Sequence, residues 1–131
     1  MEDLPMTRPV ITTTRRGDIT FHPSGRIDLT AHVSRSLGLH PGDVVNIAEE
    51  CDSPSEHYLY VVRRSEETTG RHSCTCRKVK SGRYLRVFSK SLASHILHLC
   101  HANGTLCLRV GAPTVLKGIG TALPIITASQ Q

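Results

Sequence analysis

One pattern of strands, turn and helix occurs twice in this chain, and this repetition limits the folds that the chain can adopt. Residues 17–47 read GDITFHPSGRIDLTAHVSRSLGLHPGDVVNI, in which polar and apolar residues alternate on both sides of the PSG turn at 23–25. Alternation with a period of two predicts a half-buried β-hairpin. A cruder version of the same pattern occupies residues 71–110. We therefore predict one small module in two copies.

The first copy is predicted to follow the order strand, strand, helix, strand, strand. Thr30 is the expected N-cap of the short helix, Val33 and the leucine four positions later form its apolar side, and Gly38 ends it. Strand alternation resumes after the Pro-Gly turn at 41–42, and the apolar run at 58–62 supplies one more strand. The acidic segment 49–56 is expected to be the loop between these last two strands.

The second copy keeps this order of elements with different residues. Its apolar positions correspond to those of the first copy as follows: Leu85 to Ile27, Val87 to Leu29, Leu92 to Val33, Leu99 to Leu39 and Leu106 to Val45. Gly82 corresponds to Gly25, and Asn103-Gly104 predicts a turn with positive φ before the later strands. Glycines at 111, 118 and 120 frame a last strand or hairpin. The alternative is two unrelated hairpin-helix units in an α+β domain, since short periodic patterns recur easily.

The length of 131 residues fits one domain that holds both copies. We expect a flexible N-terminal arm at 1–16, a first repeat at 17–64, a linker at 65–70, a second and divergent repeat at 71–127, and a disordered tail at 128–131. Hydrophobic residues make up 38% of the chain, aromatic residues only 4%, and tryptophan is absent. The core is therefore expected to consist of valine, isoleucine and leucine, which suit strands.

The same composition restricts location and partners. No apolar run approaches the ~20 residues that cross a bilayer, so we expect a soluble cytoplasmic protein with no membrane partner. Five cysteines, an odd number spread over both copies, indicate reduced thiols and not a disulfide framework. The formal net charge of +5 favours an anionic partner.

Residues 17–64 resemble the AbrB/MazE/SpoVT family of swapped-hairpin proteins. Its members show a strand, a Gly-Arg turn, a strand, a short helix, an LGL-like stretch and a Gly-Asp turn before another strand. In this chain those elements are Gly25-Arg26, the strand 27–29, the helix 31–36, Leu37-Gly38-Leu39 and Gly42-Asp43. The family usually has proline where this chain has Thr30. The second copy keeps Gly82-Arg83 but lacks the LGL and Gly-Asp elements.

The resemblance implies a mainly β fold with α+β character at its margins. The expected architecture is a swapped-hairpin β-barrel formed by two internal β-β-α-β-β repeats, each with one short helix. Family members complete this barrel by interlocking two chains, so a tandem copy would close it within one chain as a pseudo-dimer. Closure would remove exposed strand edges.

The resemblance also implies double-stranded DNA as the partner and transcriptional regulation as the function, because AbrB-like proteins commonly bind DNA through arginines on their hairpins. Arginine and lysine bind phosphates, and arginine also pairs with guanine edges. The candidate DNA-binding residues carried over by position are Arg15, Arg16, Arg26, Arg35, Arg77, Lys78, Lys80, Arg83, Arg86 and Lys90. In the alternative, these residues form solvated hairpin faces. The chain is then a non-enzymatic protein-interaction module, antitoxin-like or structural, that binds a protein partner or a second copy of itself.

Two groups of residues raise the question of a metal. Cys74 and Cys76 lie two apart on a predicted strand and share a face with His72. Histidines also recur every third residue near Cys100, at His95, His98 and His101. Zinc sites usually have wider Cys-x-x-Cys spacings and a second pair, so we interpret these residues as packed cysteines and surface histidines, with no metal or other cofactor.

Catalytic motifs are missing from the sequence. It contains no GxSxG, HExxH, P-loop or GxGxxG motif. We therefore expect no enzymatic activity.

Overall fold

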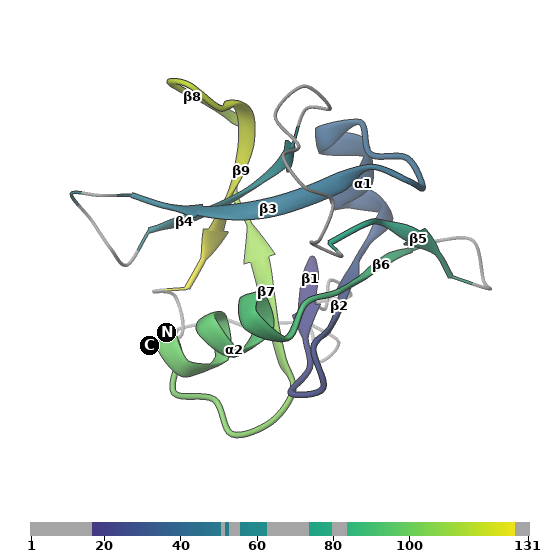
Figure 1. The fold of residues 1–131 in the computed structure, drawn as a ribbon. Helices are drawn as coiled ribbons and strands as arrows, with labels where there is room; N and C mark the ends of the chain where they lie inside the picture. The colour runs from purple at the N-terminus through teal and green to yellow at the C-terminus, as the bar shows by residue number, and fades with distance from the viewer. Residues whose placement is uncertain (1–16, 51, 53–55, 63–73, 80–83, 128–131) are drawn as a thin grey trace, which may run out of the picture.

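The computed structural model describes residues 17–50, 52, 56–62, 74–79 and 84–127 (Figure 1). Among these residues the fold is mainly β, as predicted, with nine strands and two helices. The strands are β1 (Ile19–Phe21), β2 (Arg26–Leu29), β3 (Val44–Glu49), β4 (His57–Val62), β5 (Arg77–Lys78), β6 (Leu85–Phe88), β7 (Leu106–Val110), β8 (Thr114–Leu116) and β9 (Gly120–Ile126), and the helices are α1 (Ala31–Leu37) and α2 (Lys90–Leu99).

The described strands pair in an antiparallel manner throughout. Across the sheet they follow the order β3-β4-β9-β7-β1-β2-β6-β5, and β8 pairs with β9 beside this path. The sheet curls into a half-barrel, with α1 and α2 at opposite ends of it (Figure 1). Backbone hydrogen bonds also connect the start of β3 with residues 74–76, which directly precede β5. Val45 N donates to Cys74 O at 3.0 Å, and Cys76 N donates to Asp43 O at 2.7 Å.

The core forms along the inner side of the curled sheet. Alternation directs Ile19 and Phe21 of β1 and Leu29 of β2 inward, and all three side chains are fully buried. The helices add Val33 from α1 and Ile96 from α2, which are also fully buried. Each such burial stabilises the fold by about 1.5–3 kcal/mol. The predicted core of branched aliphatic residues is confirmed.

The start of α1 differs from the prediction. Thr30 occupies the N-cap position with an extended backbone, but its hydroxyl makes no capping hydrogen bond. Thr30 Oγ1 is instead buried without a hydrogen-bond partner among the described residues. The second helix does have a side-chain cap, because Ser89 Oγ accepts from Leu92 N at 3.2 Å. Gly38 ends α1 in the left-handed conformation, as predicted.

The turn after α2 also differs from the prediction. The residue with positive φ is His101, at 55°, and Gly104 does not have a positive φ. The C-terminal hairpin of β8 and β9 agrees with its expected position. The proposed arm 1–16, linker 65–70, tail 128–131 and Gly82 turn lie outside the described residues.

Neither of the two described helices is long and apolar enough to cross a membrane. The four cysteines in the described part of the chain are free thiols: Cys74, Cys76, Cys100 and Cys107.

The turn between β1 and β2 packs against the start of α2, and this contact generates a stability prediction. Gly25 has φ +103°, and a Cβ placed there would lie 3.1 Å from the backbone of Lys90. Because the backbone conformation is strained for any side chain and the space beside Lys90 is tight, Gly25→Ala should lower the free energy of unfolding by about 1–3 kcal/mol. Urea denaturation measures this value. Gly104→Ala is the matched control, since nothing lies within 4 Å of its added Cβ. Equal losses in the two variants would contradict the prediction.

Candidate nucleic-acid interface

Three of the predicted basic residues share the outer face of the sheet. Thr20 lies opposite Asp28, Asp28 lies opposite Arg86, and Arg86 lies opposite Arg77, so one polar row crosses β1, β2, β6 and β5. Arg26 lies on the same outer side of β2, two residues before Asp28. We call the surface formed by Arg26, Arg77 and Arg86 the arginine face. These arginines come from both predicted halves of the chain.

Asp28 hydrogen-bonds to Arg86 and lies close to Arg26. Arg86 Nε donates to Asp28 Oδ1 at 2.7 Å, and Arg26 Nε lies 3.4 Å from Asp28 Oδ2. His22 Nε2 also lies 3.4 Å from Asp28 Oδ2, and Arg26 Nη2 lies 3.1 Å from His22 Nε2. The side chains of Arg26 and Arg86 are 39% and 29% exposed, whereas that of Asp28 is 14% exposed. The carboxylate therefore lies beneath guanidinium groups that solvent reaches.

Two aromatic side chains border the arginine face. Phe88 lies opposite Arg26 in the β2–β6 pair and is 47% exposed. Tyr84, on the other side of Arg86 along the chain, is 42% exposed. Exposed rings beside guanidinium groups offer flat surfaces on which an unpaired base or a partner's apolar side chain can pack.

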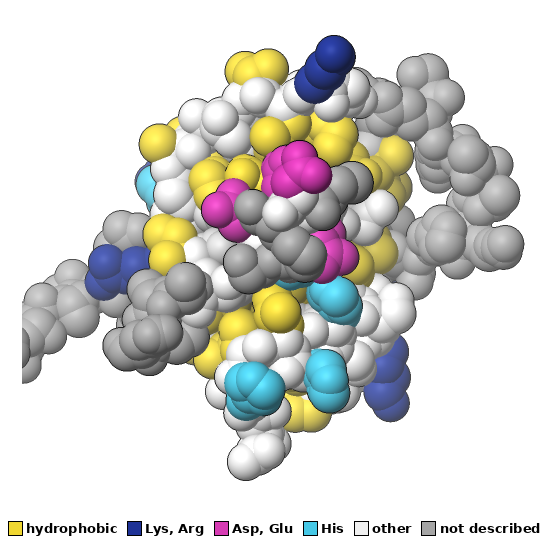
Figure 2. All heavy atoms as spheres, turned by 90° about the vertical axis from the view of Figure 1, so that its left-hand side faces the viewer, with side chains coloured by type: hydrophobic (Ala, Val, Ile, Leu, Met, Phe, Trp, Pro, Cys, Tyr) yellow, Lys and Arg dark blue, Asp and Glu magenta, His cyan; other side chains and the backbone are white. Residues whose placement is uncertain are grey.

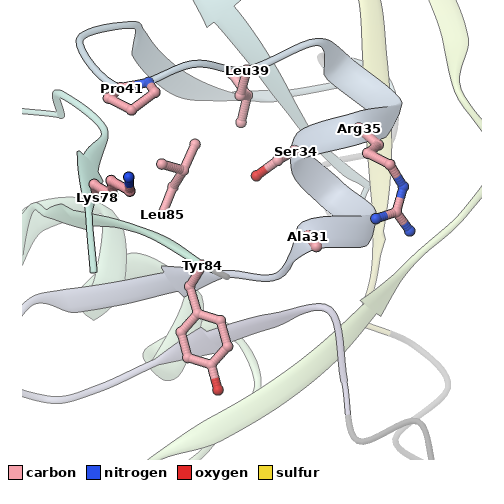
Figure 3. A pocket seen from close by; sticks show the side chains of 8 residues that line it. All are labelled: Ala31, Ser34, Arg35, Leu39, Pro41, Lys78, Tyr84 and Leu85. Atoms are coloured by element: carbon pink, nitrogen blue, oxygen red, sulfur yellow. The ribbon is translucent and has the colours of Figure 1, made fainter. Parts of the chain in front are cut away.

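The other predicted basic residues in the described part of the chain lie outside the row that defines this face. Arg35 of α1 and Lys78 of β5 line a pocket of about 300 Å³ between the helix and the β5–β6 pair, together with Ala31, Ser34, Leu39, Pro41, Tyr84 and Leu85. Figure 3 shows Lys78 on the opposite side of this pocket from α1, while the Arg35 guanidinium points away from the other side chains. Lys90 is exposed at the start of α2.

Arg15, Arg16, Lys80 and Arg83 lie outside the described residues. Among the residues that the structure describes, Arg109 is an exposed arginine that was not predicted as a site residue. Arg109 alternates along β7 with the buried Leu108 and Val110, so it faces outward. That alternation is visible in the sequence and could have identified it.

Acidic side chains gather elsewhere, around the turn between β3 and β4. Glu49 ends β3, and Glu50, Asp52 and Glu56 follow it along the chain. Figure 2 shows acidic side chains in the middle of this face of the molecule, with histidine side chains below them. In Figure 1 the β3–β4 turn and the β5–β6 pair lie on opposite sides of the molecule. This acidic cluster is therefore separated from the arginine face, in which Asp28 is the acidic residue.

Cys74 and Cys76 are both buried. They directly precede β5 and do not lie within a strand as predicted; Thr75 between them forms an isolated bridge to Val44. His72 lies outside the described residues. Burial, with added effects of the Asp43 carboxylate and the Cys74 thiol, raises the pKa of Cys76 from 9.0 to about 12. An inert, protonated thiol fits a packing role.

Comparison with protein-family models, with curated proteins and with solved structures finds no match for this chain.

The raised pKa of Cys76 predicts alkaline sensitivity. Above pH 9.0 the thiol ionises in the unfolded chain while the folded chain keeps its proton up to about pH 12, so the free energy of unfolding should fall as pH rises through this window. Cys76→Ala should make that fall shallower, as measured by urea denaturation at a series of pH values. Cys107→Ala removes an exposed thiol and should leave the pH dependence unchanged. A slope for Cys76→Ala that equals the slope of the unaltered protein would refute the assignment.

Proposed function

We propose that this protein binds double-stranded DNA through the arginine face and acts as a transcriptional regulator of the AbrB type. The observation that carries the proposal is the distribution of charge. Arg26, Arg77 and Arg86 come from three neighbouring strands and share one outer face, in which Asp28 is the acidic residue. A separate acidic cluster of Glu49, Glu50, Asp52 and Glu56 lies around the β3–β4 turn. A basic surface that is separated from an acidic one attracts a polyanion in a defined orientation.

The pairing of β2 with β6 supports an intramolecular pseudo-dimer. Ile27 faces Val87 and Leu29 faces Leu85. In the sequence repeat, Ile27 corresponds to Leu85, and Leu29 corresponds to Val87. Replacing each residue by its counterpart in the other half therefore converts each of these two pairs into the other. A two-fold axis through the pair requires a register of this kind.

Pairing between the halves is also reciprocal. Strand β1 of the first half pairs with β7 of the second, and β4 pairs with β9. The reverse arrangement is also present, because residues 74–76 of the second half form backbone hydrogen bonds with residues 43–45 of the first. Reciprocal exchange of strands is what a swapped hairpin does, and in our proposal it closes a barrel within one chain.

On this proposal the arginine face acts through phosphate contacts first. Guanidinium groups form two parallel hydrogen bonds to phosphate, and Arg77 is exposed on the edge strand β5, where DNA meets no steric barrier from a further strand on the described path. Arg86 is held in place by its hydrogen bond to Asp28, so less side-chain entropy is lost when it binds a ligand. Asp28 also cancels part of the positive charge, which limits binding strength.

The first test is fluorescence anisotropy on labelled genomic duplexes, including the protein's own promoter region, over a range of salt concentrations. Arg77→Ala and Arg86→Ala should each weaken binding and reduce the slope of log affinity against log salt by about 1. Lys117→Ala, which removes an exposed charge from the β8–β9 turn, should leave both quantities unchanged. If all three variants bind alike, DNA does not use the arginine face.

A second variant tests the same surface in the opposite direction. Asp28→Asn keeps an oxygen for Arg86 Nε but removes the negative charge beneath the arginines. Binding to the same duplexes should become several-fold tighter at low salt, because the net positive charge of the face increases. Unchanged affinity in an intact fold, checked by thermal unfolding, would count against contact between this face and phosphates.

A protein-interaction module is the second candidate function, and the exposed rings of Tyr84 and Phe88 favour it. Apolar side chains that border a charged face are typical of protein interfaces. An absence of binding to any duplex at low salt would favour this alternative.

A further inference from the structure

We propose that Glu49, His57 and His95 form a binding site for a divalent transition-metal ion, with zinc as the ion that fits best. The three residues come from β3, β4 and α2, and their ligand atoms all lie within 4.8 Å of one another. This cluster is separate from the arginine face and from the cysteines considered in the sequence. Two imidazoles and one carboxylate are the protein ligands of many zinc sites that keep a fourth position for water.

The distances within the cluster approach those of a tetrahedral zinc site. His57 Nε2 lies 3.1 Å from His95 Nε2, and two nitrogens bound to the same zinc ion are about 3.3 Å apart. Glu49 Oε2 lies 3.9 Å from His57 Nε2, and all three ligand atoms lie within 4.8 Å of one another, so the carboxylate has to approach the two imidazoles by roughly half to one and a half ångströms. Glu49 is exposed, and rotation of its side chain can supply this movement.

Burial differs among the three ligands in a way that suits metal entry. The side chain of His57 is 1% exposed and is fixed by its position in β4, directly opposite Glu49 in the pairing with β3. His95 and Glu49 are exposed, so an ion can reach the cluster from solvent. Figure 2 shows acidic side chains gathered directly above histidines on this face. Negative charge here raises the local concentration of cations.

The second nitrogen of His57 sets an upper limit on affinity. His57 Nδ1 is buried without a hydrogen-bond partner among the described residues. When Nε2 binds a metal, Nδ1 carries the proton, and the lack of an acceptor for that proton weakens metal sites by about 10- to 100-fold. The site is therefore of moderate affinity, and it selects imidazole-preferring ions over Mg²⁺ and Ca²⁺, which require more oxygen ligands.

A bound ion would connect the two halves of the chain. Glu49 and His57 belong to the β3–β4 hairpin of the first half, and His95 belongs to the helix of the second. Because the unfolded chain does not hold these ligands together, metal binding stabilises the folded state in proportion to metal concentration and affinity.

The test is titration of the metal-free full chain with Zn²⁺ by calorimetry, and with Co²⁺ by the visible absorption of tetrahedral cobalt. His95→Ala and Glu49→Gln should each weaken zinc binding by about tenfold or more and remove the tetrahedral cobalt spectrum. His98→Ala is the matched control, because His98 is also exposed on α2 and is absent from the cluster. It should bind both ions like the unaltered protein.

Zinc should also raise the thermal midpoint of the unaltered protein and of His98→Ala, but not that of His95→Ala. The unaltered protein and the three variants should all fold without metal, because each of them keeps the buried His57. Zinc binding that is unchanged in His95→Ala and Glu49→Gln would overturn the proposal. Equal weakening in His98→Ala and His95→Ala would also overturn it, by showing that surface histidines bind the ion adventitiously.

Discussion

The antiparallel pairing of β2 with β6 organises both sides of the curled sheet. It joins strands from the two halves of the chain along four residue pairs, from Arg26–Phe88 to Leu29–Leu85. Its inner side chains, among them Ile27 and Val87, are buried in the core, and its outer side carries the Asp28–Arg86 ion pair. One strand pair therefore supports the core on one side and aligns the arginine face on the other.

Much of the strand and helix order could be predicted because it is written in local periodicity. The alternation around the first hairpin, the short helix ended by Gly38 and the strand that begins near Val45 all depend on neighbouring residues. The cap of α1 could not be predicted in the same way. Thr30 has the right residue type at the right position, but the backbone and packing around it leave its hydroxyl buried without a partner among the described residues.

The arginine face could be predicted in part from the sequence, whereas the cluster of Glu49, His57 and His95 could not, because strand alternation is local and contacts between distant elements are not. Arg26, Arg77 and Arg86 are outward residues of strands, so their exposure follows from alternation, although their common face depends on which strands pair. The cluster of Glu49, His57 and His95 was missed, because His95 was interpreted as part of a helical stripe with His98. His57 and His95 meet only because the curled sheet brings β4 close to α2, and no local pattern contains that information.

The interlocked pairing of the two halves also has a consequence for the order of folding during synthesis. In the first hairpin, β1 takes β7 as its outer neighbour and β2 takes β6, so both edges of the hairpin stay unpaired until the second half has been made. Pairings between such distant segments form slowly, and they leave strand edges open to other chains in the meantime. While the edge of β1 is open, a second nascent copy can offer its own β7 to it. Exchange of halves between copies is thus an inherent misassembly route of this chain.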